Sequence, residues 1–309
     1  MRGRMVIAVG NGVAAGALWG GVFLAPQVLA GFSALQLSAA RYLVYGLAAA
    51  LLLLPRWRAL TLGRDEWLAL LGLGLLGNIV YYILLANAVR WAGGAATSLI
   101  IGMLPVVVTL VGARDHGAVQ VRKLVWPLCL CVLGVGLVGI EAMRAETGLA
   151  SSGLRAAGLL CAFGALASWA VYSVVNSRWL ARRPDISGHD WSLLTGVVTG
   201  GLALLLVAPA FGGPQQGHQA SDWLWFWSVT TAVAICASIL GNGLWNRVSR
   251  LLPLTLVGQM IIFETVFALL YGFLWAQRLP TVLEASAIAC LLAGVLWCTM
   301  AHRDTRVSG

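Results

Sequence analysis

The chain has 309 residues, of which 60% are hydrophobic and only 10% are charged, whereas about 25% of the residues of a soluble domain carry a charge. So little charge cannot cover a soluble surface, and the composition excludes a soluble globular protein. The net charge of +9 would suit a nucleic-acid-binding protein, but its distribution along the chain, given below, favours a membrane protein instead.

Long apolar runs predict helices that cross a membrane. The runs 6–40 and 251–277 match or exceed the roughly 20 residues that span a hydrocarbon core of about 30 Å. The start of the chain resembles a signal peptide, but the apolar segment continues without a small-residue cleavage site and further spans follow it. We predict ten transmembrane helices, at 5–29, 33–54, 66–89, 94–113, 124–141, 156–179, 190–211, 222–245, 252–276 and 280–301.

The basic residues are distributed unevenly between the two sides that these helices define. If the N-terminus is cytoplasmic, the outer segments hold only Arg90, Arg144, Arg155 and Arg278, and Arg41 lies within a helix, so the other 15 of the 20 basic residues lie inside. Such a bias sets the orientation of membrane proteins. We therefore predict an all-α, multi-pass protein of the bacterial cytoplasmic (inner) membrane, with cytoplasmic N- and C-termini and no nucleic-acid partner.

Weak similarities recur in the same order in the two halves. Trp19 and Trp169 each stand at the centre of a span, and PVVVTLVG from Pro105 is in register with TVFALLYG from Thr265 at Val106/Val266 and Gly112/Gly272. These matches predict two five-helix repeats, 1–145 and 154–303. Because each repeat has an odd number of helices, the second must have inverted topology, which in transporters places the binding site near the midplane.

Polar residues gather on certain helices. Asn78 and Tyr82 are four residues apart and share a helix face, and polar groups in hydrocarbon need partners. Each of these polar residues could form a hydrogen bond between helices, but as a set they favour a hydrated central cavity. The helices at 124–141 and 280–301 have few such residues and are expected at the periphery. The predicted cavity residues are Trp19, Asn78, Tyr82, Trp169, Tyr172, Asn242, Gln259 and Glu264.

Two charges, Glu264 and Arg41, lie deep within predicted spans. Glu264 is 14 residues from Arg250 and from Arg278, the nearest charges on either side. It either carries protons or hydrogen-bonds neighbouring helices. Arg41 lies eight residues into its helix, where a charge costs about 2.5–3.5 kcal/mol. We predict that Arg41 is a structural intramembrane charge that reaches polar groups at a helix end.

Other motifs carry little chemistry. Two matches to the dinucleotide fingerprint, at 72–77 and 134–139, lie inside apolar helices, where close packing through small residues explains them better than a nucleotide does. The six cysteines fall within spans and the four histidines are scattered, so we expect no metal and no cofactor. Paired carboxylates or His/Asp sets of the kind that membrane enzymes use are also missing from the sequence, and we predict that the protein is not an enzyme.

Four stretches resemble the EamA type of the drug/metabolite transporter superfamily, and the resemblance extends over essentially the whole chain. They read ALWGGVFLAPQ, SAARYLVYGLAAALLLLP, LASWAVYSVV and FETVFALLYGFLW, with Arg41 at the family's arginine and Glu264 at the glutamate that usually precedes a proline. Thr265 replaces that proline, and Gln277 stands near a second, usually acidic position. The resemblance implies ten helices in two inverted repeats around a central cavity.

Within that superfamily the chain looks most like a bacterial exporter of aromatic amino acids. We therefore predict an inner-membrane exporter of aromatic amino acids and related small metabolites that works by alternating access. A broad exporter of drugs or nucleobase-like compounds would use the same cavity and is the alternative, and an integral-membrane enzyme is a remote one. The expected partners are a small-molecule substrate and the lipid bilayer, with a monomer as the starting expectation.

Overall fold

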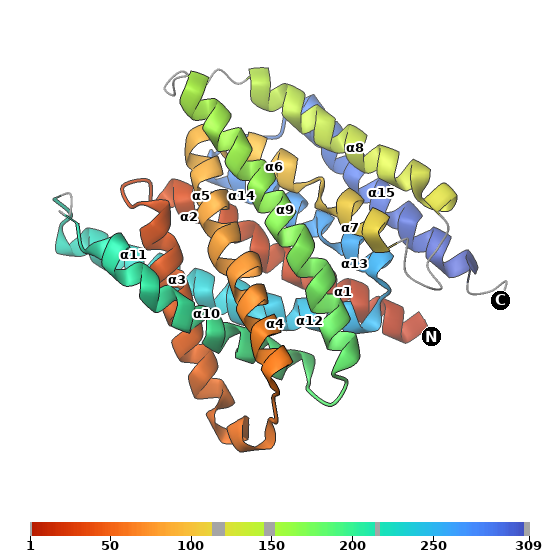
Figure 1. Ribbon diagram of the computed structural model, residues 1–309. Helices are drawn as coiled ribbons and strands as arrows, with labels where there is room; N and C mark the ends of the chain where they lie inside the picture. The colour runs from red at the N-terminus through yellow and green to blue at the C-terminus, as the bar shows by residue number, and fades with distance from the viewer. Residues whose placement is uncertain (1, 113–120, 145–151, 214–216, 306–309) are drawn as a thin grey trace.

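A computed structural model describes residues 2–112, 121–144, 152–213 and 217–305, and all its regular elements are helices (Figure 1). They lie as a bundle in which α1 begins and α15 ends on the same side of the molecule (Figure 1). The all-α fold that the apolar runs predict is thereby confirmed for the described residues.

The chain begins with two long helical segments. They comprise α1 (Arg2–Gly20), η1 (Gly21–Phe23), α2 (Ala25–Val28), α3 (Ala34–Leu53) and η2 (Leu54–Ala59). Ser33 and Gln36 form a reciprocal capping box, in which each side chain accepts a hydrogen bond from the other residue's backbone N–H. This satisfies two donors that the helix itself leaves free, and α3 therefore begins at Ala34.

The next helices are interrupted in two places. They are α4 (Arg64–Gly74), the π-helical η3 (Leu75–Val80), α5 (Tyr81–Ala92), α6 (Gly94–Ile101), α7 (Leu104–Gly112) and α8 (Val121–Arg144). Glu66 accepts a hydrogen bond from the Gly63 N–H and so caps α4. Gly93, at φ 90°, ends α5 in a conformation that a Cβ would strain.

The remaining helices repeat this pattern. They are α9 (Ser152–Arg182), α10 (Gly188–Phe211), α11 (Ala220–Val233), the π-helical η4 (Ala234–Gly241), α12 (Asn242–Leu251), α13 (Leu254–Met260), α14 (Ile262–Trp275) and α15 (Val282–Thr305). Thus a π-helical turn recurs in the stretches 64–92 and 220–251, and a break recurs between α6 and α7 and between α13 and α14. Such π-bulges frequently mark functional sites.

Seven helical stretches in the described residues are long and apolar enough to cross a membrane. They are Met5–Val28, Ala34–Arg58, Arg64–Ala92, Gly153–Arg182, Gly188–Phe211, Ala220–Leu251 and Leu256–Trp275. The other three predicted spans coincide with the broken pair α6–α7 and with α8 and α15, whose apolar stretches are shorter, Leu124–Gly134 and Val282–Cys298. The protein is therefore a multi-pass membrane protein.

Glycines let several helices approach closely. A Cβ on Gly46 of α3 would lie 2.4 Å from the Cα of Gly200 on α10, and one on Gly16 of α1 would lie 2.5 Å from the Cβ of Phe263 on α14. Within the two fingerprint-like stretches, Gly77 and Gly134 make contacts of the same kind. Small-residue packing, the interpretation that the sequence favours there, is thus confirmed at those two positions.

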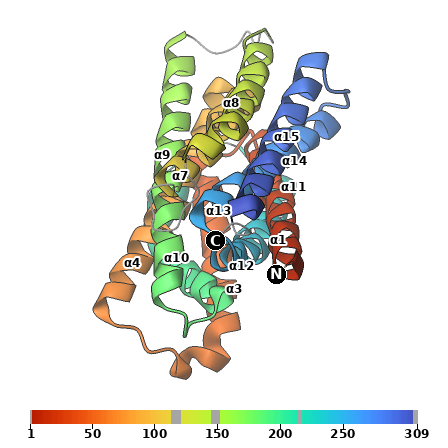
Figure 2. The same cartoon turned by 90° about the vertical axis from the view of Figure 1, so that its right-hand side faces the viewer.

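Helices α8 and α15 pack against each other along one edge of the bundle, and Figure 2 shows the pair from the side. This matches their predicted place at the periphery.

Candidate functional site

Three indole rings meet where α1, α9 and α12 come together. The ring centroids of Trp19 and Trp169 are 5.7 Å apart, and Trp245 lies 5.2 Å from the first and 5.4 Å from the second. All three side chains are buried, and we call them the tryptophan triad. The structure therefore brings together the two tryptophans that the sequence places mid-span and adds a third.

The triad is closed in this conformation. A ring inserted between two others needs about 3.5 Å on each side, or roughly 7 Å between the flanking rings, which exceeds each of the three centroid distances of 5.2–5.7 Å. The indole of Trp19 is also held by a hydrogen bond of 3.0 Å from its Nε1 to the carbonyl of Ala237 in η4. A ligand ring must therefore contact the edge of the triad or separate its members.

Tyrosines extend the aromatic surface from Trp169. Its ring centroid lies 5.6 Å from that of Tyr172 and 6.4 Å from that of Tyr81. Tyr172 packs against η3, because a Cβ on Gly77 would come within 2.1 Å of its ring. Tyr172, a predicted cavity residue, thus belongs to the aromatic cluster. Tyr81 also belongs to it, although it is not among the predicted cavity residues.

Arg41 lies inside the bundle beside this cluster. Its side chain is on α3, and its guanidinium carbon lies 4.4 Å from the ring centroid of Tyr82 and 5.0 Å from that of Tyr42, within the range of cation–π attraction. Its Nε donates a hydrogen bond of 3.1 Å to Ser238 in η4. The guanidinium therefore stays among helices, whereas the sequence had suggested that it reaches a helix end.

The charge of Arg41 is only partly compensated. The residue is 6% exposed, and its Nη1 has no hydrogen-bond partner within the described part of the chain. Among the described residues, no carboxylate oxygen lies within 4.0 Å of the Arg41 guanidinium, the limit for an ion pair. A buried, incompletely paired guanidinium is costly, which makes Arg41 a candidate for contact with a ligand.

Glu264 lies in the first turn of α14, directly after the break that separates this helix from α13. The residue is 4% exposed, and no hydrogen bond to its carboxylate occurs among the described residues. It interacts electrostatically with Arg41 and with Tyr81.

The predicted amide residues do not all join the cluster. Asn78 donates a hydrogen bond of 3.0 Å to Thr199 on α10. Gln259 donates one of 2.9 Å to Thr109 on α7 and accepts a longer one from Cys131. Asn242 lies beside the hydroxyl of Tyr45. In this conformation Asn78 and Gln259 link helices, the alternative that the sequence leaves open for such residues.

Sequence reasoning missed Trp245 and did not select Tyr81. Trp245 stands three residues after Asn242 and seven after Ser238, so helical spacing places it on the polar face of that helix. Tyr81 directly precedes Tyr82 in the stretch that carries Asn78. Trp245 Nε1 and the Tyr81 hydroxyl are buried and, in the described residues, lack hydrogen-bond partners.

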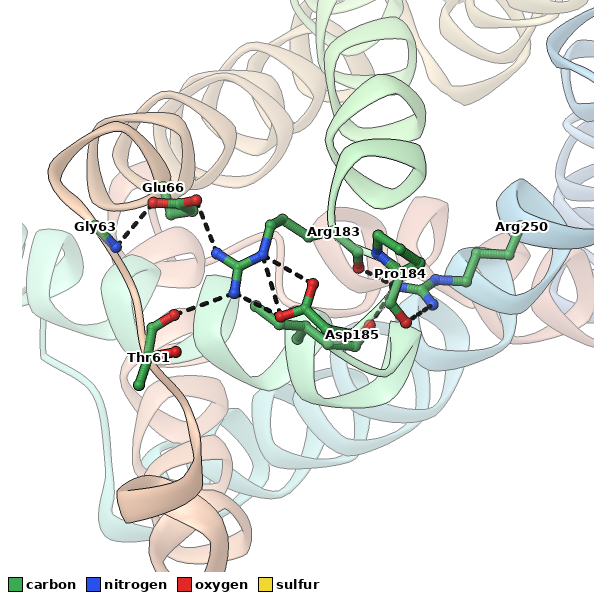
Figure 3. A network of polar contacts seen from close by, with 8 residues as sticks. Thr61, Gly63, Glu66, Arg183, Pro184, Asp185 and Arg250 are labelled. Carbon is green, nitrogen blue, oxygen red and sulfur yellow. Dashed lines mark hydrogen bonds and ion pairs between the residues drawn. The ribbon is translucent and has the colours of Figure 1, made fainter.

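A second polar network lies at one end of the bundle, around Arg183 in the connection between α9 and α10 (Figure 3). Its Nη1 contacts Glu66 at 2.7 Å, its Nε and Nη2 contact Asp185, and its Nη2 also donates to the Thr61 carbonyl. The guanidinium holds the pKa of Asp185 below its usual range. Arg250 of α12 donates to the backbone carbonyls of Arg183, Pro184 and Ile186.

These buried aromatic and charged groups within a helical bundle indicate a polytopic membrane transporter. The sequence profile of the EamA-like transporter family matches residues 6–140 and 156–300, so the chain belongs to that family and contains its domain twice. The family is one of transporters rather than enzymes. A relative, "Inner membrane protein YtfF" of Escherichia coli (strain K12), is 33% identical over 305 residues and covers 94% of each chain.

A solved structure, titled only "Crystal structure of protein", has a similar fold. Its TM-score is 0.70 at 22% sequence identity, and the match covers 96% of this chain and 98% of that one. The family match and the inner-membrane relative together make the protein an inner-membrane transporter of small molecules. The expected special resemblance to an aromatic amino-acid exporter, YddG, is corrected by the comparison: the curated relative is YtfF, whose name states a location but no substrate.

Proposed function

We propose that this transporter exports aromatic amino acids and related small metabolites across the inner membrane by alternating access. The observation that carries this proposal is the tryptophan triad with Tyr81 and Tyr172 beside a buried guanidinium group, Arg41, and a buried carboxyl group, Glu264. Aromatic rings in edge or offset contact gain about 0.5–1.5 kcal/mol beyond their burial. The side chain of an aromatic amino acid would gain that energy at the triad.

The proposed architecture is ten transmembrane helices in two inverted repeats, 1–145 and 154–303, with both termini cytoplasmic. Its support is that helices pack against their counterparts: α3 against α10, the broken pair α6–α7 against the broken pair α13–α14, and α8 against α15. The contact of α5 with α9 is likewise matched by that of α12 with α1. Such pairing is expected when two similar halves are related by a pseudo-two-fold axis.

Alternating access requires that each end of the site open in turn. At one end, Arg183 joins Glu66 of the first half to the α9–α10 connection, and Arg56 contacts Asp190 at 3.1 Å. The positive-inside rule makes this the cytoplasmic end. Opening toward the cytoplasm therefore requires that these two ion pairs between the halves break, which supports their assignment as an inner closure.

A broad exporter of drugs or nucleobase-like compounds would use the same aromatic rings. The two opposite charges are the observation that favours an amino acid, because a zwitterion carries both of the groups that they can bind. Uptake of charged but non-aromatic solutes would depend on these charges and not on the triad.

The test is transport by purified protein in liposomes with labelled Phe, Trp and Thr, with and without a pH gradient. Phe and Trp should be taken up above the level of empty liposomes. If Thr moves while Phe and Trp do not, the aromatic assignment is wrong. A dependence on the pH gradient that Glu264→Gln removes would identify Glu264 as a proton carrier, and its persistence in that variant would exclude this role.

A further inference from the structure

Three buried polar atoms near the triad lack hydrogen-bond partners among the described residues: Arg41 Nη1, the Tyr81 hydroxyl and Trp245 Nε1. The Glu264 side chain is also buried, and a Cβ on Gly16, one turn before Trp19, would lie 2.8 Å from the Glu264 backbone nitrogen. Tyr81 and Trp245 both contact Trp169, and Glu264 interacts electrostatically with Arg41 and Tyr81. Each group left unsatisfied opposes folding, so their concentration in one region points to a ligand.

The chemistry of these groups defines the ligand that would satisfy them. A guanidinium presents a planar fork of N–H donors that matches a carboxylate, and a carboxylate has room for additional donors such as an indole N–H. Glu264, when ionised, offers only acceptors, which match an ammonium group. An α-amino acid has both groups on one carbon atom.

We propose that Arg41 binds the carboxylate of the transported amino acid and that Glu264 binds its ammonium group, while Tyr81 and Trp245 supply further donors. This rests on the proposed function, since it assigns contacts within the same site. It changes the role of Arg41 from a structural charge to a specificity-determining residue. The aromatic side chain of the substrate then lies toward the triad.

A competing explanation is that Arg41 and Glu264 only neutralise each other. They interact electrostatically, but no ion pair within 4.0 Å joins these two described residues. Arg41 Nε already donates a hydrogen bond to Ser238, while Nη1 has no hydrogen-bond partner among the residues that the structure describes. Mutual neutralisation predicts that removing both charges together restores function, whereas separate substrate contacts predict that it does not.

The experiment measures the binding of three ligands to purified protein by calorimetry: Phe, 2-phenylethylamine, which lacks the carboxylate, and 3-phenylpropanoate, which lacks the ammonium group. The wild-type protein should bind both analogues about 10- to 100-fold more weakly than Phe, because each leaves one buried charge unpaired. Arg41→Gln should weaken the binding of Phe and of 3-phenylpropanoate by similar factors and leave the binding of 2-phenylethylamine unchanged. Glu264→Gln should show the opposite selectivity.

Three results would overturn the proposal. The first is that the wild-type protein binds 2-phenylethylamine as tightly as Phe. The second is that Arg41→Gln lowers the affinity for all three ligands equally. The third is that Phe binding recovers when Arg41 and Glu264 are both replaced. Because the comparison among ligands uses the wild-type protein, it remains decisive if a variant does not fold. Arg41→Lys, which keeps the charge but not the planar fork, should retain part of the carboxylate preference.

Failure of the proposed function gives a different result. If the wild-type protein binds Thr but none of the aromatic ligands, the aromatic assignment is wrong and the charge assignment is tested with 1-amino-2-propanol and 3-hydroxybutanoate, which lack the carboxylate and the ammonium group of Thr. Equal binding of Thr and 1-amino-2-propanol would then overturn the role of Arg41. Absence of binding by Phe, Trp and Thr overturns both proposals.

Discussion

Arg183 and Arg41 differ in how completely their guanidinium nitrogens are paired with hydrogen-bond or ion-pair partners. All three guanidinium nitrogens of Arg183 contact carboxylates or a carbonyl, and its side chain is 19% exposed (Figure 3). Arg41 is more deeply buried, yet its Nη1 has no hydrogen-bond partner in the described part of the chain, where its Nε donates to Ser238. A charged group that the protein satisfies completely holds elements together, while one that it leaves incomplete in its interior is available to a ligand.

The two ends of the bundle differ in a related way. At the Arg183 end the two halves meet through ion pairs. Where α11 meets the connection between α2 and α3, Phe32 stacks on His218 at 4.2 Å and lies 4.4 Å from Phe226. Breaking ion pairs exposes groups that water solvates well, whereas breaking aromatic contacts exposes apolar surface. Salt should therefore affect the first closure more than the second.

The largest expected effect separates the two arginines directly. Arg41→Gln should reduce Phe uptake by about 10- to 100-fold, because a charge-assisted contact with substrate is lost. Its melting temperature should change by less than about 2 °C, since no ion pair is broken and Gln can still donate to Ser238. Proteoliposome uptake and thermal unfolding measure the two quantities. A large drop in melting temperature with uptake preserved would return Arg41 to a structural role.

Arg183→Gln should show the reverse pattern. Loss of the contacts with Glu66 and Asp185 should lower the melting temperature by a few degrees, while Phe binding to the remaining folded protein stays unchanged. Arg182→Gln is the matched control, because it removes an equal charge at the adjacent residue, which stacks on Trp179. Equal destabilisation by both variants would mean that only net charge matters.

The triad should give a smaller effect on transport. Trp19→Ala, Trp169→Ala and Trp245→Ala should each lower Phe uptake several-fold, the loss expected from about 0.5–1.5 kcal/mol per aromatic contact. Trp19→Phe keeps a ring but removes the N–H that bonds Ala237, and so separates stacking from the hydrogen bond. The control is Trp225→Ala, at an exposed tryptophan. Unchanged uptake in all triad variants would assign these rings to packing alone.

The difference between Trp19 and Trp245 shows how far sequence reasoning reaches. Trp19 is recognisable because it stands at the middle of an apolar run. The predicted helix that contains Trp245 ends at residue 245, where polar residues begin, so this tryptophan resembles one at a membrane interface. In the structure α12 continues to Leu251, and Arg250 stabilises its last turn through carbonyls of the α9–α10 connection. That support comes from tertiary structure, which hydropathy does not report.

The helix interruptions show the same limit. Apolar runs predict the long helices to within a few residues at most ends, but not the π-helical turns η3 and η4. In each turn a carbonyl is bonded from another helix, Leu76 by Ser168 at 2.7 Å and Ala237 by Trp19 at 3.0 Å. Gln259 likewise satisfies the sequence criteria for a cavity residue, yet the rotation of α13 directs it to Thr109. These outcomes depend on partners distant in sequence.

The smallest expected effect concerns pH at the Arg183 end. Arg183 lowers the pKa of Asp185, so their ion pair contributes stability above the ordinary aspartate pKa of about 3.9 and loses it as the pH falls through the lower, folded-state value. Between pH 7 and pH 5 this pair should leave the melting temperature unchanged. Below about pH 4 the wild-type protein should lose a small increment that Asp185→Asn lacks, because that variant has no group to protonate. The increment is small because Asp185 is exposed to solvent and exposed ion pairs contribute little stability.

Thermal unfolding of the wild-type protein and of Asp185→Asn from pH 7 to pH 3.5 measures this increment. A decline in the wild-type protein between pH 7 and pH 5 that Asp185→Asn abolishes would contradict the lowered pKa.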